Sequence, residues 1–506
     1  MKQNSFIQAK EKEVAFSARV LNEQDSYGNK VLWLILSIAI LKLFVAFTLE
    51  LGNDESYYWF YSQDLKWNYF DHPPLVALWV RIFTLNLWLE DFPGFVRLGS
   101  IVSGAAATWA LYKTVAILAS NRAGWYAACI YNASFYAGLT AGLFIMPDAP
   151  QMLFWTASLW MLARIMKDEN NWSAWILFGI MAGLCIMSKV HGAFLYFGLG
   201  LFMLLKKRHW FQKPQFYTAV VISLLIVSPI LIWNIQNNFA SYRFHSERVT
   251  IDKTVEGLPF LKEVLNQAFF NNPFNVALIC IAIVSFYRVR SNRLPTLTLF
   301  NCIAWPLAGS LLFVSLFRDA TLPHWSGPAY VTLFPMAAVY LAQVSQHKWW
   351  PQWIKWSLGT FATTLLGYML LVHFYPGTLG RSSGMEMGKG DNTLDVYGWS
   401  EGGKAFETFY KKEVAQGTMQ LNNPVVCAKW WGAHVEYYFC RPLNLNMIGL
   451  GRLYLLHEYM WMNKERKEEV DFTKAYCIVP SDEYYDVEQT YSAYYSNVQL
   501  VKTIET

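Results

Sequence analysis

Residues 31–59 read VLWLILSIAILKLFVAFTLELGNDESYYW, an apolar run of membrane-spanning length followed closely by two carboxylates. A run of about 20 apolar residues is long enough to cross the hydrocarbon core of a bilayer as a helix. Asp54 and Glu55 come just after it, and charge at such a place is costly unless it binds or reacts with something. This stretch therefore predicts a membrane protein with chemistry at one face of the bilayer.

The composition of the whole chain agrees with this prediction. Hydrophobic residues make up 54% of the 506 residues and charged residues 15%, whereas soluble domains carry about 25% charged residues. The sequence predicts a mainly α, polytopic membrane protein with about eleven transmembrane helices. We expect them near residues 31–50, 95–118, 123–143, 148–166, 173–189, 192–205, 215–236, 273–289, 296–316, 325–345 and 353–373.

Lysine and arginine concentrate in alternate short loops between these runs. That bias marks the cytoplasmic side of a membrane protein, so the net charge of +5 reflects topology and does not indicate a nucleic-acid partner. The remaining loops are expected to face outward, and they comprise residues 51–94, 144–148, 188–192, 237–272, 317–324 and the chain after 375.

Three regions follow from this topology. Residues 1–30 form a polar cytoplasmic segment without a signal-peptide core, so the first apolar run is a retained anchor. Residues 31–375 form a transmembrane domain, whose first outward loop is 51–94. Residues 376–506 contain no spanning run and alternate short apolar strands with helical stretches, which predicts a small α/β domain outside the membrane.

Carboxylates stand in the first two outward loops. Asp54, with Glu55 beside it, fits a general base for an acceptor hydroxyl, because partial burial raises the pKa of a carboxyl group. Asp148, between two prolines, is a second candidate. For Asp54 and Asp148 the alternative is a helix N-cap.

The first loop also contains Asp71-His72-Pro73-Pro74. The prolines restrict His72 to an extended conformation and fit the start of an amphipathic helix on the membrane surface. His72 fits a contact to a phosphate, and Asp71 fits a metal ligand or an orienting group. A plain turn before a helix is the alternative.

Cations occupy the later outward loops. Lys189 lies in a short connection without another charged residue, where a lysine either snorkels to the interface or binds a phosphate. Arg243, Arg248 and Arg318 suit an oxyanion, and His245 is a candidate metal ligand. No Walker loop and no GxGxxG motif after a strand is present, which argues against a nucleotide cofactor. The pattern favours a reagent that lies in the membrane and carries a phosphate.

Several of these motifs carry a resemblance to a known family. The chain resembles the bacterial dolichyl-phosphate-mannose protein mannosyltransferase-like group, which is related to the aminoarabinose lipid A transferases of the GT-C glycosyltransferase superfamily. The matching motifs are Asp54-Glu55-Ser56-Tyr57-Tyr58-Trp59, Tyr69-Phe70-Asp71-His72-Pro73-Pro74-Leu75, Met146-Pro147-Asp148-Ala149-Pro150, Ser188-Lys189 and Pro323-His324-Trp325.

The resemblance implies a GT-C fold and an inverting transfer of sugar from a polyprenyl-phosphate donor to lipid A, another glycan or a protein. Asp54 would be the base with Glu55 supporting it, Asp148 would belong to the family's second acidic loop, and Lys189 would contact the donor phosphate. His245 would join the first-loop acid in holding a divalent metal ion. The expected location is the bacterial inner membrane, with the catalytic loops and C-terminal domain in the periplasm.

One departure from the family pattern concerns the donor. Aminoarabinose transferases usually have Glu-Lys-Pro-Pro where this chain has Asp71-His72-Pro73-Pro74. The change removes a lysine contact at position 72 and puts aminoarabinose specificity in question.

Two other classes use similar outward charges. A flippase or transporter of lipid-linked sugars would place its polar groups near the membrane midplane and often shows repeated halves, which this sequence lacks. An O-antigen polymerase or ligase also uses lipid-linked sugar outside the cell. The Asp54-Glu55 pair directly after the first helix favours the transferase.

Overall fold

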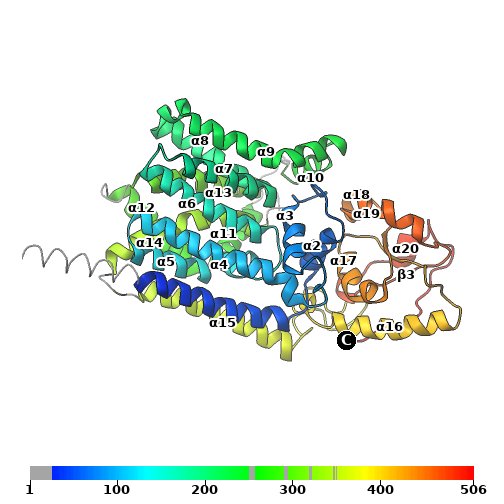
Figure 1. Cartoon of the computed structure of the whole chain (residues 1–506). Coiled ribbons are helices and arrows are strands. Elements are labelled where there is room, and N and C mark those ends of the chain that lie inside the picture. The colour runs from blue at the N-terminus through cyan, green and yellow to red at the C-terminus, as the bar shows by residue number, and fades with distance from the viewer. Residues whose placement is uncertain (1–25, 250–256, 290–293, 318–321, 346–347, 349) are drawn as a thin grey trace, which may run out of the picture.

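The computed structural model describes residues 26–249, 257–289, 294–317, 322–345, 348 and 350–506 as a long helical bundle joined to a smaller C-terminal part (Figure 1). Each predicted apolar run overlaps a helix. The bundle consists of the helix Ser26–Thr48 with α4 (Pro93–Leu118), α5 (Asn121–Ala133), α6 (Asp148–Lys167), α7 (Trp172–Ser188), α8 (Phe194–Lys206), α9 (Pro214–Gln236), α12 (Pro273–Arg288), α13 (Pro295–Ser315), α14 (Gly327–Val344) and α15 (Gln352–Phe374).

Fewer helices meet a strict criterion of length and hydropathy for a membrane span than the sequence predicts. Within the described ranges, six helices are long and apolar enough to cross a membrane, or seven if one bent pair counts as a single span. That pair is α11 (Gly257–Phe270) with α12, bent by 100°. Asn272 has a φ of 68° and Pro273 begins α12, so the chain turns sharply there. The fold is a multi-pass helical bundle, and the count of eleven is not confirmed.

The predicted run at 123–143 is divided. Its first part is α5, which ends at Ala133, and its second part is the π-helical turn η1 (Tyr136–Thr140). Wide turns of this kind occur often at functional sites, because they rotate side chains out of the α-helical register. Here the hydroxyl of Tyr136 reaches the carboxylate of Asp148 at 2.9 Å.

The first loop contains two helices, of which the first is largely buried. It contains α2 (Asn53–Gln63) and the amphipathic α3 (Leu75–Phe83), which begins after the two prolines as the sequence predicts. In Figure 1 these helices lie between the bundle and the C-terminal part. Two further helices, α10 (Ala240–Val249) and α11, follow α9 in the chain, and α11 packs against α13.

The C-terminal part contains a small parallel sheet with strand order β2-β1-β3, formed by β1 (Val425–Cys427), β2 (Met447–Gly449) and β3 (Tyr476–Cys477). Val425 of β1 pairs with Met447 on one side and Tyr476 on the other. The helices and helical turns of this part are η6 (Leu394–Val396), α16 (Trp399–Ala415), α17 (Gly432–Val435), η7 (Glu436–Cys440), η8 (Arg441–Leu443), α18 (Leu453–Leu456), α19 (Tyr459–Arg466), η9 (Lys467–Glu469), η10 (Ser481–Glu483) and α20 (Val487–Tyr491).

Much of the core of this part is shared with the first loop. Aromatic residues of α2, among them Trp59 and Phe60, belong to the same buried cluster as Tyr437 and Tyr459. The rings of Phe60 and Tyr459 stack at 4.3 Å. The C-terminal part therefore shares one buried cluster with the first loop, and it also has a smaller cluster of its own around Ile448 and Tyr491. Its two most buried cysteines, Cys427 and Cys440, carry free thiols.

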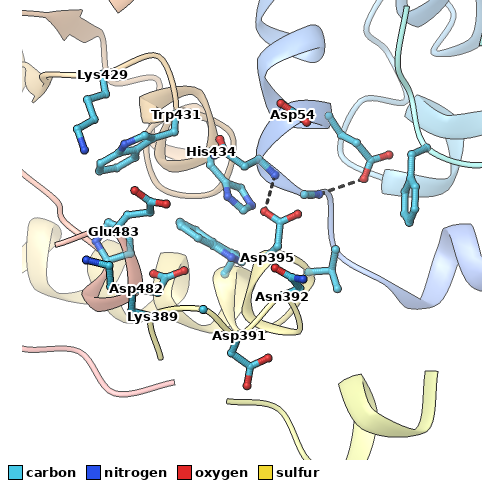
Figure 2. Close-up of a pocket in the computed structure, with 18 of the residues that line it drawn as sticks. Asp54, Lys389, Asp391, Asn392, Asp395, Lys429, Trp431, His434, Asp482 and Glu483 are labelled. Carbon is cyan, nitrogen blue, oxygen red and sulfur yellow. Dashed lines mark hydrogen bonds between the residues drawn. The ribbon is translucent and has the colours of Figure 1, made fainter. Parts of the chain in front are cut away.

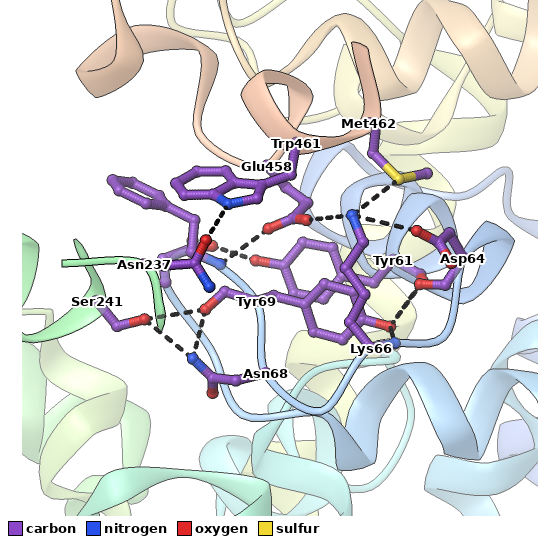
Figure 3. Close-up of polar contacts among 12 residues, drawn as sticks. Tyr61, Asp64, Lys66, Asn68, Tyr69, Asn237, Ser241, Glu458, Trp461 and Met462 are labelled. Carbon is purple, nitrogen blue, oxygen red and sulfur yellow. Dashed lines mark hydrogen bonds and ion pairs between the residues drawn. The ribbon is translucent and has the colours of Figure 1, made fainter. Parts of the chain in front are cut away.

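Polar contacts fix the same junction (Figure 3). Lys66 donates to the buried carboxylate of Glu458 at 2.9 Å, and the backbone N–H of Phe70 donates to its other oxygen, also at 2.9 Å. Trp461 donates to Asn237 at the end of α9. Three segments that are distant in the sequence are thus held together at one end of the bundle.

Candidate functional site

A cavity of about 610 Å³ lies where the first loop meets the C-terminal part (Figure 2). The start of α2 supplies Asp54, the segment before α6 supplies Met146, and the turn before α14 supplies His324. The far wall comes from residues 389–399, 429–434 and 480–484. Three of the loops that the sequence predicts to face outward therefore meet the C-terminal part at one cavity.

Asp54 faces this cavity, which leaves its carboxylate accessible to solvent. Within the described residues the carboxylate makes no hydrogen bond or ion pair. The packed protein around the cavity limits its hydration and raises the pKa of Asp54 to about 7, and the charges of Asp395, Asp71 and Glu55 add to this rise. A carboxyl group with that pKa is well suited to accept a proton near neutral pH.

Glu55 has a structural role in this geometry. Its carboxylate receives two hydrogen bonds from Arg97, at 2.8 and 2.6 Å, and two from the backbone N–H groups of Gly52 and Ile145. The contact with Gly52 caps the N-terminus of α2. With its lone pairs occupied in this way, Glu55 positions Asp54, whereas the sequence groups it with the catalytic acids.

Asp148 and Lys189, predicted from different loops, form one buried ion pair. The Nζ atom of Lys189 donates to Asp148 Oδ2 at 2.7 Å, and Tyr136 donates to the other oxygen. Asp148 is the first residue of α6, but its side chain makes no cap hydrogen bond, so the N-cap alternative is wrong. The positive charge of Lys189 lies close enough to Asp54 to oppose the rise of its pKa.

Around Lys189 lies a group of basic side chains that we call the basic cluster, defined as Lys189, Arg248, His72, His191, His245 and His324. Burial and the neighbouring cations Lys189 and Arg248 lower the pKa of His72 well below its ordinary value, so this histidine is neutral at pH 7. The ring of His72 also lies 6.3 Å from that of His245. The structure thus brings together residues from four loops that the sequence treats separately.

Arg248 is the cation of this cluster with the most freedom to bind an anion. Its guanidinium group lies over the rings of Phe244 and Trp325, at 5.4 and 4.9 Å, and makes no ion pair with a described carboxylate. A guanidinium group can hold two oxygens of a phosphate at once. Arg243 is exposed on α10, and its contact with a phosphate stays a prediction of the sequence. Arg318 lies outside the described residues.

Asp71 and His245, the two residues that the sequence offers as metal ligands, are joined by a hydrogen bond through the Asp71 backbone. The carboxylate of Asp71 accepts hydrogen bonds from Tyr57 and Tyr61, while His245 Nε2 donates to the backbone carbonyl of Asp71 at 2.8 Å. In the part of the chain that the structure describes, three side chains able to hold a metal ion do not gather at any point. The arrangement fits hydrogen bonding, and metal dependence stays a prediction of the sequence.

The far wall of the cavity was missed by sequence reasoning. Asp395 accepts a 2.9 Å hydrogen bond from the backbone N–H of Asn53, and burial raises its pKa to about 6. Trp431 and His434 line the same wall, and Trp399 stacks on His434 with ring centroids 3.6 Å apart. The weak signal for this wall was the segment Gly390-Asp391…Gly398-Trp399-Ser400-Glu401, which resembles the start of the family's outer domain but assigns no role to these residues.

Three comparisons with known proteins found similar sequences and structures. Residues 71–233 match the family described as dolichyl-phosphate-mannose-protein mannosyltransferase. The lipid A galacturonosyltransferase RgtD of Rhizobium johnstonii is 23% identical over 190 residues, which is 38% of this chain and 40% of that protein. The match thus spans less than half of that relative. The crystal structure of ArnT from Cupriavidus metallidurans bound to undecaprenyl phosphate is similar over 88% of this chain and 89% of that one, with a TM-score of 0.57 and 16% identity.

Together these findings support a relation to the GT-C superfamily of glycosyltransferases. The apo structure of the same ArnT gives a TM-score of 0.56 at 15% identity over the same shares of both chains. The likeness to ArnT shows that the two proteins share a fold. The matched family segment contains Asp71, His72, Asp148 and Lys189, whereas Asp54 lies before it.

Proposed function

We propose that this protein transfers a sugar from a polyprenyl-phosphate donor to an acceptor hydroxyl outside the cytoplasm. The observation that carries the proposal is the position of Asp54, an unpaired carboxylate with a pKa near 7 that faces a cavity beside the basic cluster. A carboxylate that can accept a proton therefore lies beside cations that can bind a phosphate. A structure of ArnT with bound undecaprenyl phosphate, on the same fold, supports a lipid phosphate as the donor group.

In the proposed step, the acceptor oxygen attacks the anomeric carbon of the donor sugar while its proton passes to the carboxylate of Asp54. The new C–O bond forms as the bond from the anomeric carbon to the phosphate oxygen breaks, and the electron pair leaves with the polyprenyl phosphate. Attack opposite the leaving group inverts the anomeric carbon. Arg248, with Lys189 held in place by Asp148, stabilises the charge that develops on the phosphate.

The neutral histidines of the basic cluster complete this environment. His72 and His245 have pKa values lowered by burial, so they offer hydrogen bonds without adding charge. The hydroxyl of Tyr58 lies near the charges of Asp54, Asp148 and Arg248. Tyr58 therefore stands between the carboxylate of Asp54 and the cation of the basic cluster. We place the acceptor hydroxyl on the Asp54 side of Tyr58 and the donor phosphate on the Arg248 side.

The location and acceptor belong to the same proposal. We place the protein in a bacterial inner membrane with the cavity on the periplasmic side, as the distribution of basic loops indicates. The acceptor is a lipid, glycan or protein, and the name of the lipid A galacturonosyltransferase RgtD supports a lipid-borne one.

Product formation tests this proposal. The purified full chain in detergent is incubated with radiolabelled polyprenyl-phosphate sugars and an outer-envelope acceptor fraction, and label is followed from donor to acceptor. We expect labelled acceptor and free polyprenyl phosphate in equal amounts. If the donor stays intact while the protein, reconstituted in vesicles, moves it between leaflets, the protein is a flippase and the proposal fails.

A further inference from the structure

The far wall of the cavity carries negative charge that the protein does not neutralise. Asp395, Asp482 and Glu483 line it, and none of the three makes an ion pair with a described cation. The two lysines on this wall do not pair with these carboxylates. Lys389 makes an ion pair with Glu386 outside the wall, and Lys429 lies near the rings of Trp431 and Tyr485. With Asp54 and Asp391, five carboxylates that make no ion pair with a described cation line the cavity, against the two lysines.

An unused hydrogen-bond donor lies on the same wall. The side chain of Trp431 is 6% exposed, and its indole N–H has no partner within the described residues. Opposite the far wall, the side-chain oxygen of Asn53 is likewise buried without a partner. Buried polar groups are normally satisfied, so these two unpartnered atoms in residues that line the cavity are candidate contacts for a bound ligand. The indole of Trp399, by contrast, already donates to the carbonyl of Leu394.

These features define one ligand chemistry. Carboxylates accept hydrogen bonds from hydroxyl groups, an indole N–H donates to a ring or hydroxyl oxygen, and the flat face of tryptophan packs against the apolar face of a sugar. A phosphate or carboxylate ligand would be repelled by Asp395, Asp482 and Glu483 at short range. The wall therefore suits a ligand that is rich in hydroxyls and carries no negative charge.

We propose that this cavity binds a non-anionic saccharide as the acceptor, with Trp431 and Asp395 as its recognition residues and the reacting hydroxyl at Asp54. The inference rests on the proposed function and adds the acceptor class to it. Charge is divided across the site accordingly: the basic cluster takes the donor phosphate, and the acidic wall excludes anions from the acceptor side. His324 belongs to the basic cluster and also lines the cavity, and the charges of Lys189 and Arg248 act on its ring.

Binding of matched sugars without donor tests the inference. Saturation-transfer NMR on the full chain in detergent compares galactose, N-acetylglucosamine and glucosamine with galactose 1-phosphate, N-acetylglucosamine 1-phosphate and glucosamine 6-phosphate. We expect at least one non-anionic sugar to bind, and to bind about tenfold more tightly than its phosphate. Equal or tighter binding of the phosphates, or no signal from any of the three non-anionic sugars, overturns the proposal.

Two variants tie the binding to the wall. Trp431→Phe keeps an aromatic ring and removes the N–H, so sugar binding should weaken roughly 3- to 10-fold, as for the loss of one hydrogen bond. Trp88→Phe is the matched control, because Trp88 is 76% exposed and outside the cavity lining. Asp395→Asn keeps the side-chain volume and should strengthen binding of the sugar phosphates. Unchanged binding in both cavity variants, with thermal unfolding like the wild type, contradicts the assignment.

The same measurements separate this inference from the proposed function. Sugar binding needs no donor, so it can be positive in a protein that transfers nothing, and then the proposed function fails while the saccharide site stands. If transfer occurs but anionic acceptors are preferred, the proposed function stands and the acidic wall is not the acceptor site.

Discussion

The Nζ atom of Lys189 lies 2.7 Å from Oδ2 of Asp148, and both side chains are almost fully buried. The two residues are 41 positions apart, one at the end of α7 and the other at the start of α6. Their contact joins two loops at the mouth of the bundle and holds a cation beside the cavity. A buried pair of this kind depends on both partners, because either charge alone is costly in a poorly hydrated place.

Removing Lys189 should therefore destabilise the protein more than removing both charges. We expect Lys189→Met to lower the unfolding free energy by roughly 3–5 kcal/mol, and the double variant Lys189→Met with Asp148→Asn to recover most of that loss. Thermal unfolding in detergent measures this comparison. A single variant as stable as the wild type would show that Asp148 does not rely on Lys189.

The transfer rate should depend on pH through Asp54. The carboxylate is the active form, so activity should rise with pH and reach half its maximum near pH 7, the pKa of Asp54. Because the charge of Asp395 raises this pKa, Asp395→Asn should move the midpoint to lower pH. Asp168→Asn, at an exposed site outside the cavity lining, is the control. A midpoint that stays in place in Asp395→Asn would rule out coupling between the two carboxyl groups.

Gly52 should be intolerant of a side chain for a reason that involves Asp395. A Cβ atom at position 52 would lie 2.5 Å from Oδ2 of Asp395, so Gly52→Ala must push that carboxylate away. We expect transfer to fall by about ten- to a hundredfold with little change in thermal unfolding, as small displacements in a site can cost that much. Gly359→Ala is the matched control, because a Cβ there would meet nothing within 4 Å. Equal activity of the two variants contradicts the prediction.

Glu458 should make stability depend on pH. Burial outweighs its pairing with Lys66 and raises its pKa from 4.5 to about 7, so the folded protein binds a proton that the unfolded chain releases. Its contribution to stability is complete below pH 4.5 and is lost as the pH rises toward 7. Glu458→Gln should lack this loss and gain stability relative to the wild type between pH 5 and 8. Glu407→Gln, on the exposed face of α16, should follow the wild-type curve.

The sequence predicted the bundle well because apolar runs record lipid contact directly. The run at 215–236 corresponds to α9 and the run at 353–373 to α15, within one residue at each end. The break after Ala133 was not predictable, since it depends on packing against distant side chains: a Cβ on Gly138 would meet Phe361 at 2.6 Å.

The candidate site was half predictable. Asp54, Asp148 and Lys189 stood out because charge beside an apolar run is costly without a function. Pairing of Asp148 with Lys189 was not visible, because nothing local in the sequence records a contact over 41 residues. Asp395 and Trp431 gave little signal, since charged and aromatic residues are ordinary in a polar region and their importance comes from the cavity they share with Asp54.

Sugar transfer by Asp54→Asn tests the central claim most directly. The variant is compared with the wild type and with Asp91→Asn, whose side chain is 74% exposed in the same loop, using labelled polyprenyl-phosphate sugar at pH 8. Loss of a general base predicts a rate about 10²- to 10⁴-fold lower in Asp54→Asn, with donor binding and thermal unfolding unchanged. Asp91→Asn should retain the wild-type rate. A rate for Asp54→Asn within tenfold of the wild type would contradict the role of Asp54 as the base.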